Sequence, residues 1–281
     1  MNILLAVDGS EHAAWATALL SALPLAKAPT ITVLHVVEPL PEVRAMLTPT
    51  ERHAYSTALR EQVAEKRERG HALVKRPLER LRKRWTRVRA VVEEGPAADT
   101  ILATAKRRKA ELIVVGSRGL GHLQRFVMGS VSHRVTTYAP CSVLVVKEPP
   151  RHLKNVLMAL DGSPYAADAA AFVGAMLARR QIRATAVCVW EFPDRIPVPA
   201  SAKALVRERC ARVMRRAGLA DHVEFATGRP ANEIARIARR KHAGLVVVGS
   251  RGLTGLKRFL LGTVSHEVIL QSPASVLVFR R

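Results

Sequence analysis

The sequence predicts an α/β protein built from two tandem halves, each an open parallel five-stranded sheet flanked by helices. Short β-branched runs alternate along the chain with segments that have the apolar spacing of helices, which is typical of βαβ units. The landmarks of the first half then recur in the same order in the second half, which indicates a tandem duplication. Hydrophobic residues make up 48% of the chain but aromatic residues only 4%, which favours an aliphatic core of buried strands under alanine-rich helices.

Five strands are predicted in the first half, at residues 3–7, 31–37, 88–92, 112–115 and 142–146. Helices are expected between them, because strands that alternate with helical segments form parallel sheets. The helix after the second strand, from about residue 50, is expected to be lengthened. Pro77 is expected to end or kink that helix, since proline lacks the backbone N–H that a helix interior uses.

The two halves keep the same spacing between their landmarks except at one point. The interval from the second strand to the glycine that follows the third strand is 60 positions in the first half (His35 to Gly95) and 40 in the second (Cys188 to Gly228). The first half therefore has about 20 extra residues between its second and third strands.

The boundary between the halves is predicted at the KEPPR segment, residues 147–151. Its two prolines stop the fifth strand and make a stiff connection. We therefore expect one domain over residues 1–149 and a second over residues 152–281.

The formal net charge of +22 is shared by both halves. A surface this basic attracts polyanions, such as nucleic acid, nucleotides or acidic lipids, through long-range electrostatics. The charge alone does not say which of these is functional.

The chain has the features of a cytoplasmic protein. No apolar run approaches the roughly 18 residues of a membrane span, and the opening MNILLAVDGS is typical of a strand and not of a signal peptide. Cys141, Cys188 and Cys210 are odd in number and far apart, which argues against a disulfide framework and against a zinc site.

Each half has glycines in the pattern G-2x-G-9x-G followed by a hydroxyl residue, directly after a buried strand. Ligands bind at the carboxyl ends of parallel strands, and the start of the next helix offers unpaired N–H groups to a phosphate. The pattern is neither a P-loop nor the dinucleotide G-x-G-x-x-G. The alternative is structural: the first glycine ends the strand, the second makes a turn, and the hydroxyl residue is a helix N-cap.

Together with a D-G-S after the first strand and a closing SVLVV strand, this glycine pattern resembles the universal stress protein family, over nearly the whole chain and twice. The resemblance implies two Rossmann-like sheets of strand order 3-2-1-4-5 and a stress-response protein that binds ATP, together with Mg²⁺. It also implies that the two halves pair through their last strands, and it allows a homodimer of the tandem chain.

The resemblance assigns the site residues by position. In the first half, it implies phosphate contacts from Gly116, Gly119, Gly129, Ser130, Val131 and Ser132, and base and ribose contacts from Ala6 and Val36. In the second half, the equivalents are Gly249, Gly252, Gly262, Thr263, Val264 and Ser265, with Ala159 and Val189.

Two further pairs of residues have open roles. The resemblance puts Asp8 and Asp161 near the nucleotide, where they can help to order a divalent metal through water; an Asx turn or a helix N-cap is the alternative. Arg118 and Arg251 match phosphate oxygens chemically, but ordinary solvated arginines explain them equally well.

The second site differs from the first at two positions. Cys188 stands where the first half has His35, and the larger Trp190 stands where it has Val37. Because the expected base contact is through backbone, the cysteine matters little, whereas the tryptophan could crowd the base pocket.

Three functions of different kinds remain open. The leading one is a nucleotide-dependent regulator or protectant, with no catalytic residue assigned. The second is slow ATP hydrolysis, for which His133 and His266 are the proton-transfer candidates, although no carboxylate accompanies both. The third is binding of nucleic acid or an anionic surface through the basic residues between 66 and 89, which is not favoured because Trp85 is the only aromatic residue there.

Overall fold

The computed structural model of the protein describes residues 1–38, 49–119, 128–151, 153–191, 199–219, 222–250 and 261–280, with backbone only for 49–59. The first half contains β1 (Asn2–Ala6), β2 (Thr30–Val37), β3 (Val88–Glu94), β4 (Leu112–Gly116) and β5 (Ser142–Val146). The second contains β6 (Asn155–Ala159), β7 (Arg183–Trp190), β8 (Val223–Thr227), β9 (Leu245–Gly249) and β10 (Ser275–Phe279). The helices are α1 (Glu11–Ala22), α2 (Pro49–Arg82), α3 (Ala97–Arg107) and α4 (Ser130–Tyr138), then α5 (Pro164–Met176), α6 (Ala200–Arg216), α7 (Pro230–Arg240) and α8 (Thr263–Gln271), with a 3₁₀ turn η2 (Arg179–Gln181).

The strands form one ten-stranded sheet of order β3-β2-β1-β4-β5-β10-β9-β6-β7-β8. Each half is parallel and has the order 3-2-1-4-5, which confirms the predicted α/β class and strand order. The sheet is continuous because β5 and β10 pair antiparallel, with Leu144 opposite Leu277. Both strands of this seam are fully buried, so two edges that would otherwise offer unpaired backbone groups are closed.

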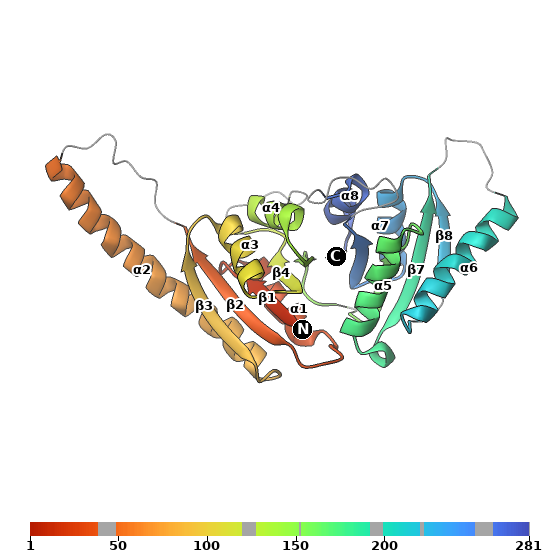
Figure 1. The fold of residues 1–281 in the computed structure, drawn as a ribbon, viewed down its shortest axis with the longest axis horizontal. Helices are drawn as coiled ribbons and strands as arrows, with labels where there is room; N and C mark the ends of the chain where they lie inside the picture. The colour runs from red at the N-terminus through yellow and green to blue at the C-terminus, as the bar shows by residue number, and fades with distance from the viewer. Residues whose placement is uncertain are drawn as a thin grey trace.

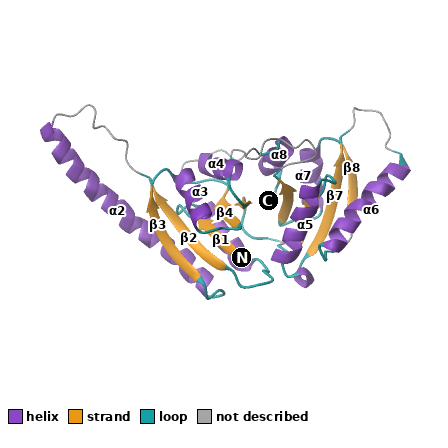
Figure 2. Ribbon diagram, viewed as in Figure 1, coloured by secondary structure: helices purple, strands orange, loops and turns teal. Residues whose placement is uncertain are grey.

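Helices cover both faces of the sheet (Figure 2). Side chains alternate along each strand, so Ile3 and Leu5 join the core under α1, α2, α5 and α6, while Leu4 joins the core under α3, α4, α7 and α8. Each of these two cores contains residues from both halves and crosses the seam. No helix in the described ranges is long and apolar enough to span a bilayer.

The extra residues of the first half lengthen α2. This helix has 34 residues against 17 in α6, its counterpart. α2 and α6 lie at opposite ends of the molecule, and part of α2 projects past the sheet (Figure 1). The helix continues through Pro77, so the prediction that this proline could end it is wrong; Val74 and Leu81 on either side are buried against the sheet and hold the helix in place.

A basic residue at the end of each seam strand caps a helix of the other half. The ammonium of Lys147, after β5, donates to the carbonyls of Ile269 (2.7 Å), Leu270 (3.1 Å) and Ser272 (2.5 Å) at the end of α8. The guanidinium of Arg280, after β10, donates to the carbonyls of Thr136 (3.2 Å), Thr137 (3.0 Å) and Ala139 (2.9 Å) at the end of α4. These cations satisfy carbonyls that a helix end leaves unpaired, and they complement its negative dipole end.

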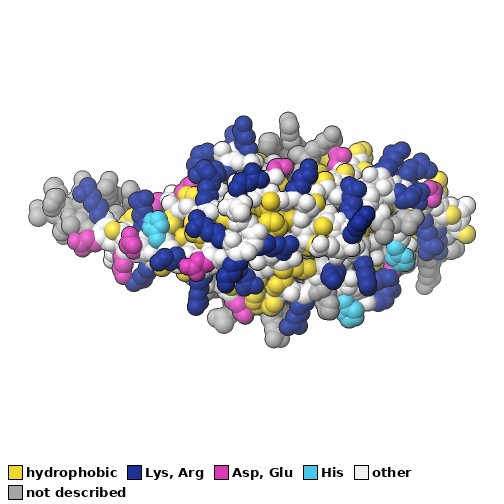
Figure 3. Space-filling view, turned by 90° about the horizontal axis from the view of Figure 1, so that it is seen from below, with side chains coloured by type: hydrophobic (Ala, Val, Ile, Leu, Met, Phe, Trp, Pro, Cys, Tyr) yellow, Lys and Arg dark blue, Asp and Glu magenta, His cyan; other side chains and the backbone are white. Residues whose placement is uncertain are grey.

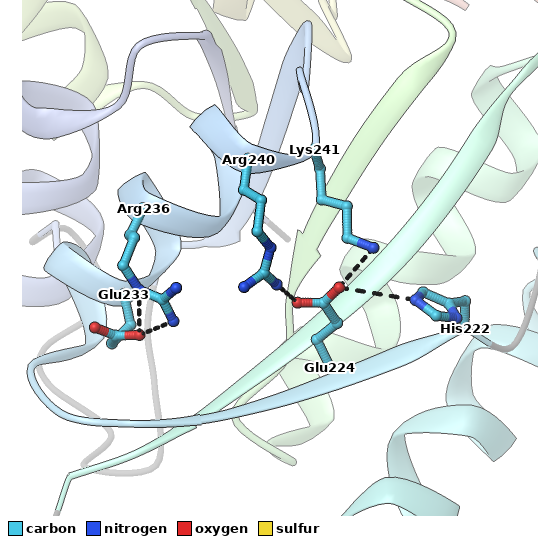
Figure 4. Close-up of polar contacts among 6 residues, drawn as sticks. All are labelled: His222, Glu224, Glu233, Arg236, Arg240 and Lys241. Atoms are coloured by element: carbon cyan, nitrogen blue, oxygen red, sulfur yellow. Dashed lines mark hydrogen bonds and ion pairs between the residues drawn. The ribbon is translucent and has the colours of Figure 1, made fainter.

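At the outer edge of the second half, Glu224 of β8 ties the strand to the end of α7 (Figure 4). Its carboxylate accepts from Arg240 and, at 2.6 Å, from Lys241, and the ring of His222 lies 3.8 Å away. Burial raises the pKa of Glu224, but the hydrogen bond from Lys241 and the charges of Lys241, Arg240 and His222 outweigh it and hold the pKa below its usual value. On α7 itself, Arg236 pairs with Glu233 at 2.6 Å.

Replacing Glu224 with glutamine should destabilise the protein in a pH-dependent way. Because folding lowers the pKa of this carboxyl, its contribution is present above the unfolded pKa and is lost as the pH falls through the folded value. We expect Glu224→Gln to reduce the free energy of unfolding by about 1 kcal/mol at pH 7, with the difference shrinking at about pH 3. Urea unfolding at both pH values measures this, with Glu208→Gln, which removes an exposed pair with Arg215, as the control. An equal loss at both pH values would contradict the electrostatic explanation.

Candidate functional site

A cavity of about 460 Å³ opens at the carboxyl ends of β1, β2 and β4 in the first half. It is lined by all ten first-half residues that the sequence predicts: Ala6, Asp8, Val36, Gly116, Arg118, Gly119, Gly129, Ser130, Val131 and Ser132. Residues more than 100 positions apart along the chain are thus brought to one place, because the carboxyl ends of adjacent parallel strands share an edge of the sheet.

The start of α4 forms one wall of this cavity. Gly129 is the N-cap, with extended backbone and no side-chain capping bond, so the alternative in which Ser130 is the cap is wrong. The first intrahelical bond runs from the N–H of His133 to the carbonyl of Gly129 at 2.9 Å. The N–H groups of residues 130–132 therefore have no carbonyl partner within the helix, and the positive dipole end faces the cavity.

The hydroxyl of Ser132 has an internal role. It is buried and lies within hydrogen-bond distance of the carbonyls of Ser117 (2.8 Å) and Gly129 (2.9 Å), which ties the start of α4 to the end of β4. Ser265 does the same in the second half by donating to the carbonyl of Gly249 at 2.5 Å. At both positions, the backbone N–H and not the hydroxyl is the group available to a ligand.

The first two glycines of the motif have different neighbours. A Cβ on Gly116 would lie 2.8 Å from the carbonyl carbon of His12, so this glycine allows α1 to pack closely on β4. A Cβ on Gly119 would lie 2.6 Å from Oδ2 of Asp8, so this glycine leaves room beside a carboxylate at the cavity wall. Close packing against α1 therefore requires a glycine at position 116, and both Gly116 and Gly119 line the cavity.

Asp8 forms an Asx turn. Its Oδ1 accepts from the N–H of Ser10 at 2.9 Å, and the hydroxyl of Ser10 then caps α1 by accepting from the N–H of Ala13 at 3.2 Å. Gly9 between them has φ +85°, which favours glycine. One oxygen of Asp8 thus shapes the turn, and the other faces the cavity beside Gly119.

Arg118 makes the mouth of the cavity electropositive. Burial, and then the charge of Arg118, lowers the pKa of His12. The same two causes lower the pKa of Lys147 to about 8, against an opposing effect of Glu148. Of these three groups only Arg118 lines the cavity, where its guanidinium adds positive charge.

The comparison with known families is decisive at this point. The universal stress protein family model matches residues 1–147 and again residues 152–280. The chain belongs to the universal stress protein family. A tandem member of this family carries the fold twice, as the ten-stranded sheet does.

Similar proteins agree with this assignment. A universal stress protein of Mycobacterium bovis is 31% identical over 188 residues, which cover 62% of this chain and 63% of that protein, so the match spans less than two thirds of the relative. A universal stress protein of Thermus aquaticus is 37% identical over 146 residues, 52% of this chain and 98% of its own length. A solved universal stress protein of Archaeoglobus fulgidus covers 100% of this chain and 98% of its own, with a TM-score of 0.70 and 22% identity, and so shares the fold.

The cavity of this universal stress protein also contains residues that sequence reasoning missed. They are Val7, Ala13, Leu34, His35, Val37, Glu38, Lys66, Arg69, Ala97, Ile101 and Val115. Most are apolar and come from β2, α3 and the strand ends, opposite the polar start of α4. The Nδ1 of His35 lies 2.8 Å from the carbonyl of Val7, and Glu38 accepts from the N–H of Ala97 at 3.3 Å. Lys66 and Arg69 come from the lengthened α2, and the extra basic residues there were the available signal.

The second half repeats this geometry at the described positions. The predicted residues Ala159, Asp161, Val189, Gly249, Gly262, Thr263, Val264 and Ser265 lie at or next to the ends of β6, β7 and β9 and at the start of α8. Asp161 forms the same Asx turn, accepting from the N–H of Ser163 at 2.9 Å. Arg251 and Gly252 lie outside the described residues. The ring of Trp190 packs edge-on against Phe225, 6.0 Å between centroids, and a hydrogen bond with Cys210 and burial raise the pKa of Cys188.

The two proton-transfer candidates contact each other. His133 of α4 and His266 of α8 lie edge to face across the seam, with 5.4 Å between ring centroids. Neither ring forms an ion pair or hydrogen bond with an acidic residue of the described chain, and the neighbouring Arg134 pairs with Asp99 at 2.9 Å. Within the same residues, no three His, Cys, Asp or Glu side chains cluster closely enough to hold a metal ion.

Adding a methyl group at Gly116 should destabilise the protein without any ligand. The new Cβ would meet the backbone of α1, which can yield only by moving the helix away from β4. We expect Gly116→Ala to reduce the free energy of unfolding of nucleotide-free protein by about 1–3 kcal/mol. The control is Ser130→Ala, an exposed first helical residue in the same cavity, with an expected change below about 0.5 kcal/mol. Equal stability of Gly116→Ala and the unmodified protein would show that the close packing on α1 is not required.

Proposed function

We propose that the protein is an ATP-binding universal stress protein that acts as a nucleotide-dependent regulator or protectant. The observation that supports it most is the cavity itself, where an apolar wall and a helix N-terminus with unpaired N–H groups face each other at the carboxyl edge of a parallel sheet. An adenine nucleotide has the matching parts, an apolar base and an anionic phosphate chain.

In this proposal, the base lies against the apolar residues of β2 and α3, where Val36 offers backbone groups and Ile101 is buried. The phosphates accept from the N–H groups at the start of α4, and Gly119 leaves the space that a side chain would fill. Arg118 adds positive charge at the mouth. If Mg²⁺ accompanies the nucleotide, Asp8 is the residue that would help to hold it, because its Oδ2 lies beside Gly119 at the cavity wall.

We propose binding, and not rapid hydrolysis, as the function. The histidines that would have to move protons contact each other and not a carboxylate of the described chain. Binding of nucleic acid is not favoured, because Lys and Arg side chains spread along the length of the molecule and do not gather in one patch on the face in Figure 3. Several of them also pair with Glu or Asp, as Arg107 does with Glu93.

We further propose that the two halves act as one unit in the cytoplasm. The seam between β5 and β10 and the reciprocal caps from Lys147 and Arg280 support pairing of the halves in solution. Residues 1–149 and 152–281 are then the two domains. A homodimer of the tandem chain stays a prediction.

Aspartate at the start of each motif helix should weaken ATP binding to the corresponding half while leaving the fold intact. Ser130→Asp and Thr263→Asp add a negative charge where the phosphates would lie, yet an acidic residue in the first turn favours the helix. We expect each substitution to weaken ATP binding to its own half at least about tenfold, with unchanged or higher thermal stability.

The measurement is calorimetric titration with Mg-ATP, after denaturing freshly purified protein to identify and count nucleotide that it already carries. Two equivalents per chain, reduced to one by either substitution, support both sites. One equivalent that Ser130→Asp abolishes and Thr263→Asp does not supports the first site alone. No binding at millimolar ATP would overturn the proposed function.

A further inference from the structure

The lengthened helix α2 contributes two cations to the first-half cavity, Lys66 and Arg69. They approach from the face of the sheet that α1 and α2 cover, whereas the N-terminus of α4 approaches from the opposite face. The cavity thus has two electropositive walls: the start of α4 and a segment of α2.

The positions of Lys66 and Arg69 follow from the packing of the next turn of α2 against the sheet. Gly70, four residues after Lys66, packs against the ring of His35 in β2, where an added Cβ would lie 2.7 Å from Cδ2. Leu73, four residues after Arg69, packs against Gly9, where an added Cβ would lie 2.8 Å from Cδ2 of the leucine. Residues four apart share a face of a helix. Lys66 therefore lies one helical turn before the residue that contacts β2, and Arg69 lies one helical turn before the residue that contacts Gly9.

The charge of Lys66 is not balanced by the described protein. Lys66 is partly buried as a residue, and its ammonium makes no hydrogen bond or ion pair with another described residue. Arg69 pairs with Glu65 at 2.5 Å, but both side chains are largely exposed (72% and 61%), and such a pair contributes little. Two carboxylates also line the cavity, and each accepts one backbone N–H, Glu38 from Ala97 and Asp8 from Ser10; neither forms an ion pair with Lys66. A cation in the cavity lining that no described residue pairs with favours an anionic ligand.

In the described part of the second half, α6 has no cation at the positions that correspond to Lys66 and Arg69, although Arg209 lies one or two turns further along the helix. Arg209 of α6 packs beside Gly162 as Leu73 of α2 packs beside Gly9, which aligns the two helices. In this alignment, Ala202 and Leu205 occupy the positions of Lys66 and Arg69, and Leu205 is 72% exposed. The duplication has therefore left two sites with similar helix N-termini and different opposite walls.

Resting on the proposed nucleotide function, we propose that the first-half site selects adenine nucleotides with at least two phosphate groups, and that Lys66 and Arg69 are its selectivity-determining residues. The N-terminus of α4 holds one phosphate, and the cations of α2 hold another. That second phosphate is either further along the 5′ chain or attached to the ribose.

The test measures dissociation constants for AMP, ADP, ATP and adenosine 3′,5′-bisphosphate by calorimetry. The full chain carries Thr263→Asp, so that the first half is observed alone. The variant is Lys66→Ala/Arg69→Ala. The matched control is Arg67→Ala/Lys75→Ala, which also removes two positive charges from α2; neither of these residues lines the cavity, and Arg67 lies near Glu94 at 3.8 Å.

We expect the double variant to weaken binding of a nucleotide with two or more phosphates at least about tenfold and that of AMP less than about threefold, and the control to change neither by more than about threefold. A loss confined to ADP and ATP identifies the 5′ chain, and a loss confined to the bisphosphate identifies a phosphate on the ribose. Equal losses for AMP and the others, no loss, or the same losses in the control would overturn the inference while leaving the proposed function in place. If the chain that carries Thr263→Asp alone binds none of the four nucleotides, the proposed function fails together with the inference.

Discussion

The antiparallel pairing of β5 with β10 is the constraint on which the rest of the molecule depends. Each half alone would leave its last, fully apolar strand as an open edge, and the pairing closes both edges at once. It joins two five-stranded sheets into one and lets both cores run across the seam. It also brings the basic residue that follows each seam strand to the helix end that it caps, Lys147 to α8 and Arg280 to α4.

The same seam sets the relation between the two candidate sites. The motif helices α4 and α8 begin on either side of it, and His133 and His266 meet edge to face between them. A ligand at the start of one helix is therefore close to groups that belong to the other half. Tandem duplication within one chain has kept this arrangement while allowing the two halves to diverge, as α2 and α6 have done in length and in charge.

Several residues of the motif serve the fold as well as the cavity. Gly116 allows α1 to pack on β4, the hydroxyl of Ser132 fastens α4 to the end of that strand, and Asp8 shapes the turn into α1. The backbone N–H of Ser132 and the second oxygen of Asp8 remain on the cavity side. Repetition of the motif in the second half is thus explained partly by folding, which requires the same short side chains wherever a strand, a turn and two helices meet.

The sequence by itself determined the α/β class, the five strands of each half, the family and the ten first-half residues that line the cavity, because these follow from local periodicity, from the repeat and from one motif. It could not determine the continuity of α2 through Pro77, which buried contacts of Val74 and Leu81 maintain against local preference. Nor could it assign Lys66 and Arg69 to the cavity, because they lie 50 and 47 positions from Gly116 along the chain, and only the packing of α2 beside β2 brings them there. Sequence patterns report local geometry, whereas the side chains that meet across a site are decided by how distant elements pack.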